Sequence, residues 1–235
     1  MPRDFYKVLV VGSPGKGKTY GARTLDPETT GYINTEGKPL PFKNNFKYYG
    51  IAKTKDEVFK FLNAFAKMPQ IKTIVFDSLS FYAENSLREI KARGIKGFEI
   101  YNQVNESYTD LFDAMNSIPK EFIIISHEER LQTLDGDLEK RAKALGKAYE
   151  GMIEKVFTIV LFAATKKQEG SILPTYWLNL YQEGTSAKTP PDIFGADESG
   201  RQVTTIPNDY KMLMEKIWEF VGENNTSDVQ SEKKS

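Results

Sequence analysis

Residues 12–19, GSPGKGKT, form the segment whose residue types and spacing most directly indicate a chemistry. They fit the Walker A pattern G-x-x-x-x-G-K-[ST], which follows an apolar run and precedes an amphipathic segment. In such a loop, backbone N–H groups and the start of the next helix point at phosphate groups. We expect Lys18 to bridge the β- and γ-phosphate oxygens of a nucleotide and the Thr19 hydroxyl to bind Mg²⁺. The predicted nucleotide-binding residues are Gly12, Ser13, Pro14, Gly15, Lys16, Gly17, Lys18, Thr19 and Tyr20.

A second apolar run, KTIVFDS at 72–78, delivers Asp77 at its carboxyl end. Open α/β sheets bind ligands at this end of their strands, so Asp77 is predicted to hold the Mg²⁺ shell as a Walker B aspartate. An alternative is that Asp77 caps the helix expected to begin near Ser80. Mg²⁺ held by phosphate, Thr19 and Asp77 is the only metal chemistry that the sequence predicts.

Two further polar residues follow apolar runs. Glu36 lies near the end of the segment GYINTEG at 31–37, where a carboxylate can polarise the water that attacks a γ-phosphate. His127, the single histidine, directly follows the run EFIIIS. The plainer alternatives are a surface carboxylate at Glu36 and a packed or capping histidine at His127.

The spacing of apolar residues predicts the elements that position these side chains. Short apolar runs alternate with amphipathic segments, which is typical of a doubly wound, mostly parallel sheet flanked by helices. Predicted buried strands are Tyr6–Val11, Gly31–Thr35, Lys72–Asp77, Glu121–Ser126 and Val156–Ala163, and a late strand, Thr175–Leu180, pairs with the last of them. Predicted helices are Gly17–Leu25, Lys55–Lys67, Ser80–Ala92, Phe98–Ser117 and Asn208–Val221. We therefore expect one α/β domain over 1–221 and a disordered polar tail over 222–235.

Composition excludes several classes of protein. The 235 residues include no Cys and one His, which excludes disulfides, thiolate zinc sites, iron–sulfur clusters and multi-histidine metal centres. Lys plus Arg and Asp plus Glu both number 32, so bulk attraction to nucleic acid is not expected. The mean hydropathy of -0.48 indicates a globular protein, and no apolar stretch is long enough for a signal peptide or a membrane span, so cytoplasmic residence is expected.

Taken together, these motifs resemble those of RecA-like P-loop ATPases, most closely the phage nucleotide-binding proteins that include single-strand annealing proteins. The resemblance covers roughly residues 5–195 and implies that Glu36 is the catalytic base and His127 the γ-phosphate sensor. It also implies that Lys188, in SAKTPPDIF at 186–194, reaches a neighbour's nucleotide site as a finger residue. Because the first strand begins near residue 5, we expect a homo-oligomeric ring or short filament with ATP at the interface, rather than a long filament.

By the same resemblance, two locally basic stretches correspond to the DNA-binding loops of RecA-like proteins. Phe98 and Tyr101 follow the first and can stack on bases. Asp135–Gly136, in the second, is a hairpin signal. A solvated helix face and an ordinary hairpin are the alternative. The predicted contacts to single-stranded DNA are Arg88, Lys91, Arg93 and Lys96 in the first stretch, and Arg130, Lys140, Arg141 and Lys143, followed by Lys147, in the second.

These observations predict an Mg²⁺-ATP-dependent ATPase of phage DNA recombination or single-strand annealing. Partners implied are single-stranded DNA and, by resemblance, a single-strand-binding protein or exonuclease. One alternative is an ATPase that acts on protein partners, such as a helicase loader or a packaging or partitioning ATPase. A small-molecule P-loop kinase would need a compact Arg-rich lid, which the sequence lacks. A nucleotide-binding scaffold with negligible turnover is the non-enzymatic alternative.

Overall fold

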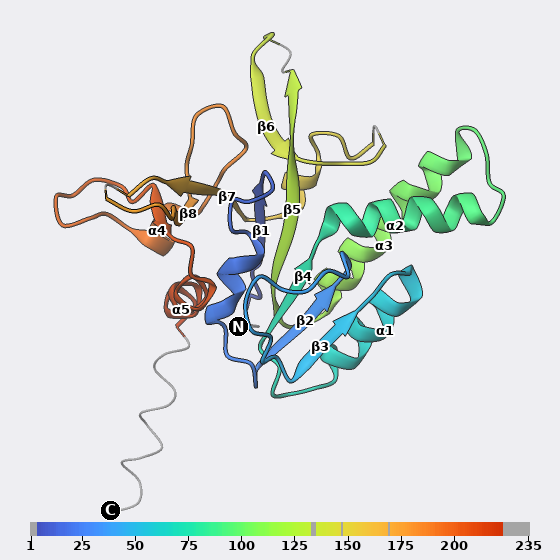
Figure 1. Ribbon diagram of the computed structural model, residues 1–235, viewed down its shortest axis with the longest axis horizontal. Helices are drawn as coiled ribbons and strands as arrows, with labels where there is room; N and C mark the ends of the chain where they lie inside the picture. The colour runs from blue at the N-terminus through green and yellow to red at the C-terminus, as the bar shows by residue number, and fades with distance from the viewer. Residues whose placement is uncertain (1–3, 133–134, 147, 169, 223–235) are drawn as a thin grey trace, which may run out of the picture.

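The computed structural model describes residues 4–132, 135–146, 148–168 and 170–222 (Figure 1). Its strands are β1 (Lys7–Gly12), β2 (Thr30–Asn34), β3 (Tyr48–Ile51), β4 (Thr73–Asp77), β5 (Glu121–Gln132), β6 (Leu138–Ala142), β7 (Ile159–Lys166), β8 (Thr175–Asn179) and β9 (Thr205–Pro207). Its helices are α1 (Lys55–Ala66), α2 (Leu79–Ala92), α3 (Glu99–Ser117), α4 (Pro191–Phe194) and α5 (Tyr210–Phe220), with 3₁₀ helices η1 (Thr19–Thr24) and η2 (Ile153–Val156).

The strands form one mixed sheet in the order β3-β2-β4-β5-β1-β7-β8-β9, and β6 pairs with the outer half of β5. Neighbouring strands from β3 to β7 run parallel, whereas β8 and β9 are antiparallel to their neighbours. The predicted α/β fold with a late antiparallel strand pair is confirmed. The parallel strands β1, β2 and β4 are buried on both faces, which explains their continuous apolar sequences.

Alternate residues of the central strands belong to two separate cores. Leu9 and Val11 of β1 pack with α1, α2 and α3 on one face of the sheet. Val8 and Val10 pack with η1 and α5 on the other face. Figure 1 shows the corresponding layers, with α1 to α3 to the right of the sheet and α5 to the left. Because successive side chains of a strand point to opposite faces of the sheet, one apolar run contributes to both cores.

Helix starts are defined by polar side chains. Thr54 and Glu57 form a reciprocal capping box at the start of α1, and Ser78 caps α2 through the Phe81 N–H. Asp77 is therefore not the cap of α2, so the alternative role considered for it is wrong. Three of the predicted helices, Lys55–Lys67, Ser80–Ala92 and Phe98–Ser117, agree with the structure to within one residue.

The segment predicted as helix Gly17–Leu25 is instead a 3₁₀ helix over Thr19–Thr24. The Gly21 N–H is shared between the carbonyl groups of Gly17 and Lys18, at 3.1 and 3.3 Å. Side chains before and within α5 occupy the same two carbonyl groups, because Asn208 donates to Gly17 and Tyr210 donates to Lys18. Packing against α5 thus shapes this turn.

Other differences concern short or extended strands. The segment Val156–Ala163 begins its strand only at Ile159, because residues 153–156 form η2. The last predicted helix begins at Tyr210 rather than Asn208. Strands β3 and β9 were not predicted. The hairpin at Asp135–Gly136 is present, but β5 runs six residues beyond the predicted Ser126, to Gln132, before it. Most of the predicted polar tail, 223–235, lies outside the described residues.

Candidate nucleotide site

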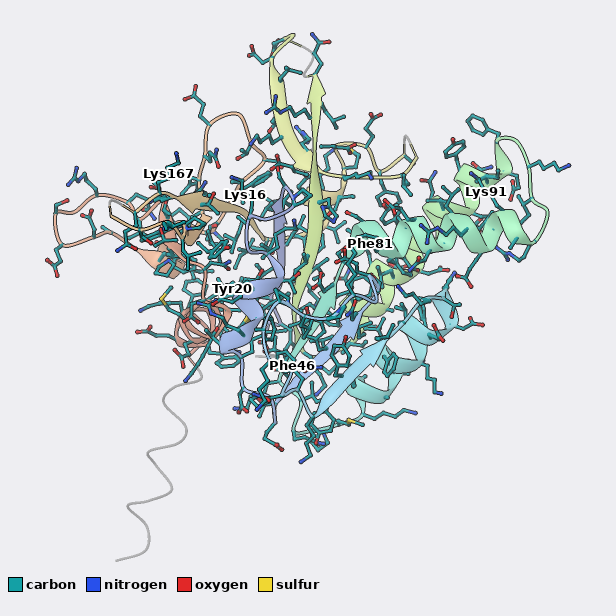
Figure 2. The ribbon with its side chains drawn as sticks, viewed as in Figure 1. Lys16, Tyr20, Phe46, Phe81, Lys91 and Lys167 are labelled. Atoms are coloured by element: carbon teal, nitrogen blue, oxygen red, sulfur yellow. The ribbon has the colours of Figure 1, made fainter. Side chains whose placement is uncertain are left out.

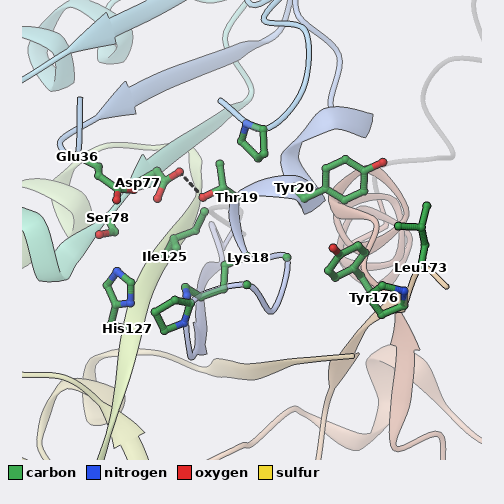
Figure 3. Close-up of a pocket in the computed structure, with 15 residues that line it drawn as sticks. Lys18, Thr19, Tyr20, Glu36, Asp77, Ser78, Ile125, His127, Leu173 and Tyr176 are labelled. Atoms are coloured by element: carbon green, nitrogen blue, oxygen red, sulfur yellow. Dashed lines mark hydrogen bonds between the residues drawn. The ribbon is translucent and has the colours of Figure 1, made fainter. Parts of the chain in front are cut away.

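The carboxyl ends of four parallel strands bring the predicted site residues together. Gly12 of β1 lies opposite His127 of β5, and Asn34 of β2, two residues before Glu36, lies opposite Asp77 of β4. A cavity of about 610 Å³ opens at this edge (Figure 3). It is lined by Pro14, Gly15, Gly17, Lys18, Thr19, Tyr20, Glu36, Pro41, Asp77, Ser78, Ile125, His127, Leu173, Pro174 and Tyr176.

The glycine loop curls around the Lys18 side chain. Gly15 and Gly17 have φ angles of 77° and 82°, a left-handed conformation that favours glycine. The Lys18 ammonium donates to the Gly12 and Ser13 carbonyl groups at 2.6 and 3.0 Å. Burial lowers the pKa of Lys18 to about 8, although Asp77, Glu128 and Glu36 act in the opposite direction. The loop therefore holds a desolvated cation at the floor of the cavity.

Two hydroxyl groups converge on the Asp77 carboxylate. Thr19 Oγ1 and the Tyr32 hydroxyl donate to Asp77 Oδ2 at 2.8 and 2.6 Å. Burial raises the pKa of Asp77, whereas these two hydrogen bonds favour its ionised form. Because the Thr19 hydroxyl donates its hydrogen bond to Asp77, the lone pairs of its oxygen remain available to a cation. These hard oxygen donors beside a phosphate loop fit Mg²⁺, which binds one or two carboxylates together with substrate phosphates.

Glu36 and His127 lie on the wall of the same cavity (Figure 3). Glu36 pairs with Lys38 at 2.5 Å, and its side chain is 23% exposed, so it is open to a ligand. The His127 ring meets Phe81 edge to face at 5.8 Å. Burial and the Lys18 charge lower the pKa of His127, so the ring is neutral at pH 7 and can accept or donate a hydrogen bond.

The opposite end of the cavity is apolar and was largely missed from the sequence. Tyr20 was predicted, but Leu173, Pro174 and Tyr176, from the β7–β8 hairpin, were not. The rings of Tyr20 and Tyr176 contact each other with centroids 5.4 Å apart, and Figure 3 shows both beside Leu173. In the sequence, a proline followed by an alternating strand does not distinguish this hairpin from any other.

Some predicted residues lie outside the cavity. Gly12, Ser13 and Lys16 belong to the glycine loop but do not line the cavity. The Lys16 ammonium donates a hydrogen bond to the Thr165 hydroxyl at 3.0 Å. Lys188 is exposed, and its backbone pairs with Val160, near the amino end of β7. Lys188 therefore does not line its own chain's nucleotide cavity.

The basic side chains of the two predicted DNA-binding stretches differ in ion pairing and exposure. Lys140, Arg141 and Lys143 form ion pairs with Glu128, Glu139 and Glu84 at 3.5, 2.6 and 3.2 Å. Arg130 is exposed on the outer part of β5, and Lys147 lies outside the described residues. By contrast, the four cations of the first stretch, Arg88, Lys91, Arg93 and Lys96, are all exposed.

Phe98 and Tyr101, the predicted stacking residues, are also exposed, at 83% and 50%. They line a groove of about 640 Å³ whose other wall is formed by Ala144, Gly146, Ala148 and Glu150. The ends of the two predicted stretches therefore meet at this groove, but none of the eight predicted DNA-contacting cations, all of them within the described residues, lines it. Figure 2 places Lys91 on the outer part of α2, away from Lys16 and Tyr20 at the nucleotide site.

A phosphate loop after β1, a buried lysine and an aspartate at the end of β4, which is separated from β1 by β5, define a P-loop nucleotide-binding protein. Residues 4–205 match the family described as AAA domain, and the chain belongs to this family. None of the curated proteins compared with the chain matches it. The crystal structure of a KaiC-like protein from the hyperthermophilic archaeon Pyrococcus horikoshii is similar, with a TM-score of 0.46 and 14% identity over 79% of this chain and 83% of that chain.

Together with the phosphate loop, this family makes the protein a P-loop ATPase of the AAA class. In the ranges that the structure describes, no helix combines the length and apolar character needed to cross a bilayer.

Proposed function

We propose that the protein hydrolyses Mg²⁺-ATP and uses the nucleotide state to control binding of single-stranded DNA in recombination or single-strand annealing, as the phage nucleotide-binding proteins that it resembles do. One observation carries the ATPase part of this proposal. Lys18, Thr19, Asp77, Glu36 and His127, which lie in or after strands β1, β2, β4 and β5, line a single cavity.

Each side chain has a distinct role in this proposal. Lys18 leaves the Gly12 and Ser13 carbonyl groups to bind phosphate oxygens, which compensates the cost of its burial. Glu36 accepts a proton from the attacking water, and neutral His127 hydrogen-bonds to the γ-phosphate. Thr19 and Asp77 would hold Mg²⁺, which supplies charge neutralisation of the phosphates when bound.

The arrangement of strand β5 supports a link from ATP to DNA. His127 lies at the nucleotide cavity, and the same strand continues to Gln132 in the β5–β6 hairpin, which projects beyond the sheet (Figure 1). The loss of γ-phosphate contacts can therefore shift the hairpin and its exposed Arg130. The exposed cations and aromatic rings near 88–101 supply a second surface with charge and stacking groups.

The remaining parts of the proposal concern assembly and setting. The protein acts as a homo-oligomer with ATP at the interface, where Lys188 of one protomer neutralises charge at the neighbour's site. Exposure of Lys188 away from its own cavity supports this role. The setting is the cytoplasm, that of the host if the protein is phage-encoded, and a single-strand-binding protein or exonuclease is the protein partner.

The test measures ATP turnover with and without single-stranded DNA at two salt concentrations. We expect stimulation by DNA that falls steeply with salt, because phosphate contacts release counterions. The double variant Lys91→Glu/Lys96→Glu should abolish stimulation but keep the DNA-free rate. Lys60→Glu, a charge reversal at an exposed position of α1, is the matched control. The ion-paired hairpin cations are poorer targets, because their reversal also disturbs the fold.

Other outcomes would redirect the assignment. Equal turnover with and without DNA, together with no DNA binding in a gel shift, contradicts the DNA part and favours an ATPase that acts on protein partners. Absence of turnover despite nucleotide binding contradicts the enzymatic part and favours a nucleotide-binding scaffold.

A further inference from the structure

Tyr32 is a buried tyrosine of β2 whose hydroxyl reaches the nucleotide site. Its side chain has no solvent exposure, and in the sheet it lies directly opposite Val75 of β4. The hydroxyl extends two residues further along β4 and donates to Asp77 Oδ2 at 2.6 Å. Aromatic side chains are long enough to make such diagonal contacts across neighbouring strands.

This hydrogen bond constrains the orientation of the Asp77 carboxylate. The terminal torsion of an aspartate is broad, so an unsupported carboxylate turns easily. Here Thr19 and Tyr32 both donate to the same oxygen, Oδ2. Among the residues that the structure describes, no side chain donates to the other oxygen, Oδ1. The two donors thus fix one carboxylate oxygen and leave the other for a ligand in the cavity.

The Tyr32 ring is itself held in place. It stacks on Phe46, with centroids 5.1 Å apart, and contacts Tyr49 at 5.7 Å. Tyr49 is in turn fixed by Asn34, whose side-chain amide donates to the Tyr49 hydroxyl at 2.7 Å. A ring packed in this way cannot follow a turning carboxylate, so its hydroxyl is a rigid support.

We infer that Tyr32 is a positioning residue for the metal ion: it orients Asp77 so that Oδ1 and the Thr19 oxygen face the cation that accompanies the nucleotide. This inference rests on the proposed Mg²⁺-ATP site. Groups that hydrogen-bond to metal ligands fix their orientation, and their removal weakens metal binding about 10- to 100-fold.

The test is Tyr32→Phe, which keeps the ring and its packing but removes the hydroxyl. Mn²⁺ binding to the ADP-bound protein, followed by electron paramagnetic resonance, should weaken about tenfold. Binding of ADP in the presence of a chelator should stay unchanged, because Tyr32 contacts Asp77 and not the phosphate loop. The Mn²⁺ concentration needed for half-maximal ATPase rate should rise by a similar factor.

Tyr82→Phe is the matched control. Tyr82 is equally buried and donates to the Ser107 carbonyl at 2.9 Å, away from the cavity. Its loss should lower the unfolding midpoint without changing Mn²⁺ binding. If Tyr32→Phe fails to fold, Phe46→Leu keeps the hydroxyl but loosens the ring, and we again expect weaker Mn²⁺ binding.

The possible failures are distinguishable. A wild-type protein that binds ADP but no Mn²⁺ contradicts the proposed metal site as a whole. A wild-type protein that binds Mn²⁺, together with a folded Tyr32→Phe variant that binds it within twofold as tightly, contradicts the role of Tyr32 alone.

Discussion

The Ser13 hydroxyl of the glycine loop donates a 2.6 Å hydrogen bond to Glu128 Oε1. Glu128 stands directly after His127 at the root of the β5–β6 hairpin and also pairs with Lys140 at 3.5 Å. One carboxylate thus joins the phosphate loop to both strands of the hairpin. Its charge favours the protonated form of Lys18, although Glu128 does not itself line the nucleotide cavity.

Glu128→Gln should tighten ATP binding. The amide retains an oxygen for Ser13 but removes a negative charge next to the phosphates, a change of about 1 kcal/mol or about fivefold in affinity. The gain should shrink as salt rises. Calorimetric titration at two ionic strengths measures both effects. Glu139→Gln removes a carboxylate of the same hairpin that pairs with Arg141, and it should leave affinity unchanged. Equal effects of the two variants would show that Glu128 does not act on the nucleotide.

Glu36→Gln should separate binding from turnover. Loss of a general base costs roughly 100-fold or more in rate, whereas the affinity for ATP should stay within about threefold, because Glu36 does not hold the phosphates. Single-turnover hydrolysis and equilibrium binding measure the two quantities. Glu28→Gln is the control, because Glu28 is also paired with a lysine, Lys47, at 2.7 Å, but lies outside the cavity. Turnover of Glu36→Gln close to wild type would exclude Glu36 as the base.

Sequence patterns predicted those features that depend on residues close together in the sequence. The phosphate loop needs its glycines and lysine at fixed spacing, and buried parallel strands need unbroken apolar runs, so the sequence alone indicates Gly12–Thr19 and Asp77 as candidates. Strand β3, YYGI, was missed because it is short and contains Gly50. That glycine is needed because an added Cβ would come within 2.1 Å of the Phe61 ring, a contact made only in the folded chain.

The parts of the site that the sequence does not reveal also depend on contacts between residues far apart in the chain. Tyr32 resembles any aromatic strand residue, and only the pairing of β2 with β4 brings its hydroxyl to Asp77. Tyr176 lies more than 150 residues beyond the phosphate loop, yet it packs so closely that a Cβ on Gly17 would lie 2.4 Å from its ring. The ion pairs of Lys140 with Glu128 and of Lys143 with Glu84 likewise join residues far apart in the sequence, which charge counting along the chain does not identify.

Nucleotide affinity should depend on pH through Lys18. The pKa of Lys18 is about 8 without nucleotide, below its ordinary 10.5, because the ammonium is buried. Bound phosphate favours the ammonium, so affinity should be constant below pH 8 and fall above it, by at most tenfold per pH unit. Between about 8 and 10.5 the unfolded chain binds more protons at this residue than the folded chain. The contribution of Lys18 to the free energy of unfolding of the nucleotide-free protein therefore rises with pH in this window.

Titration calorimetry in buffers of different ionisation enthalpy should detect proton uptake on nucleotide binding near pH 8.5. Lys120→Met is the control for a general effect of buried lysines. Lys120 also donates to two carbonyl groups, those of Met68 and Ile71, and burial lowers its pKa, but it lies outside the nucleotide cavity. Its variant should keep the pH profile of the wild type. A flat wild-type profile between pH 7 and 9.5 would contradict the lowered pKa of Lys18.

The apolar end of the cavity should bind the nucleoside part of ATP. Glu36, His127 and Asp77 lie at one end of the cavity, whereas Tyr20, Tyr176 and Leu173 lie at the other (Figure 3). A triphosphate whose γ-phosphate meets Glu36 and His127 must therefore extend its base toward the tyrosines. Leu173 is 74% exposed, so its truncation will not disturb the core.

Leu173→Ala should weaken ATP binding about fivefold, because a base would bury only part of this side chain, whose full burial is worth about 1.5–3 kcal/mol. It should not change the binding of inorganic triphosphate, which has no base. Ile172→Ala is the matched control, because Ile172 is the adjacent residue of the same hairpin, is fully exposed and does not line the cavity. Competition binding with both ligands gives the comparison. Equal losses of ATP and triphosphate affinity would mean that Leu173 acts on the phosphate loop, whereas no loss for either would place the base elsewhere.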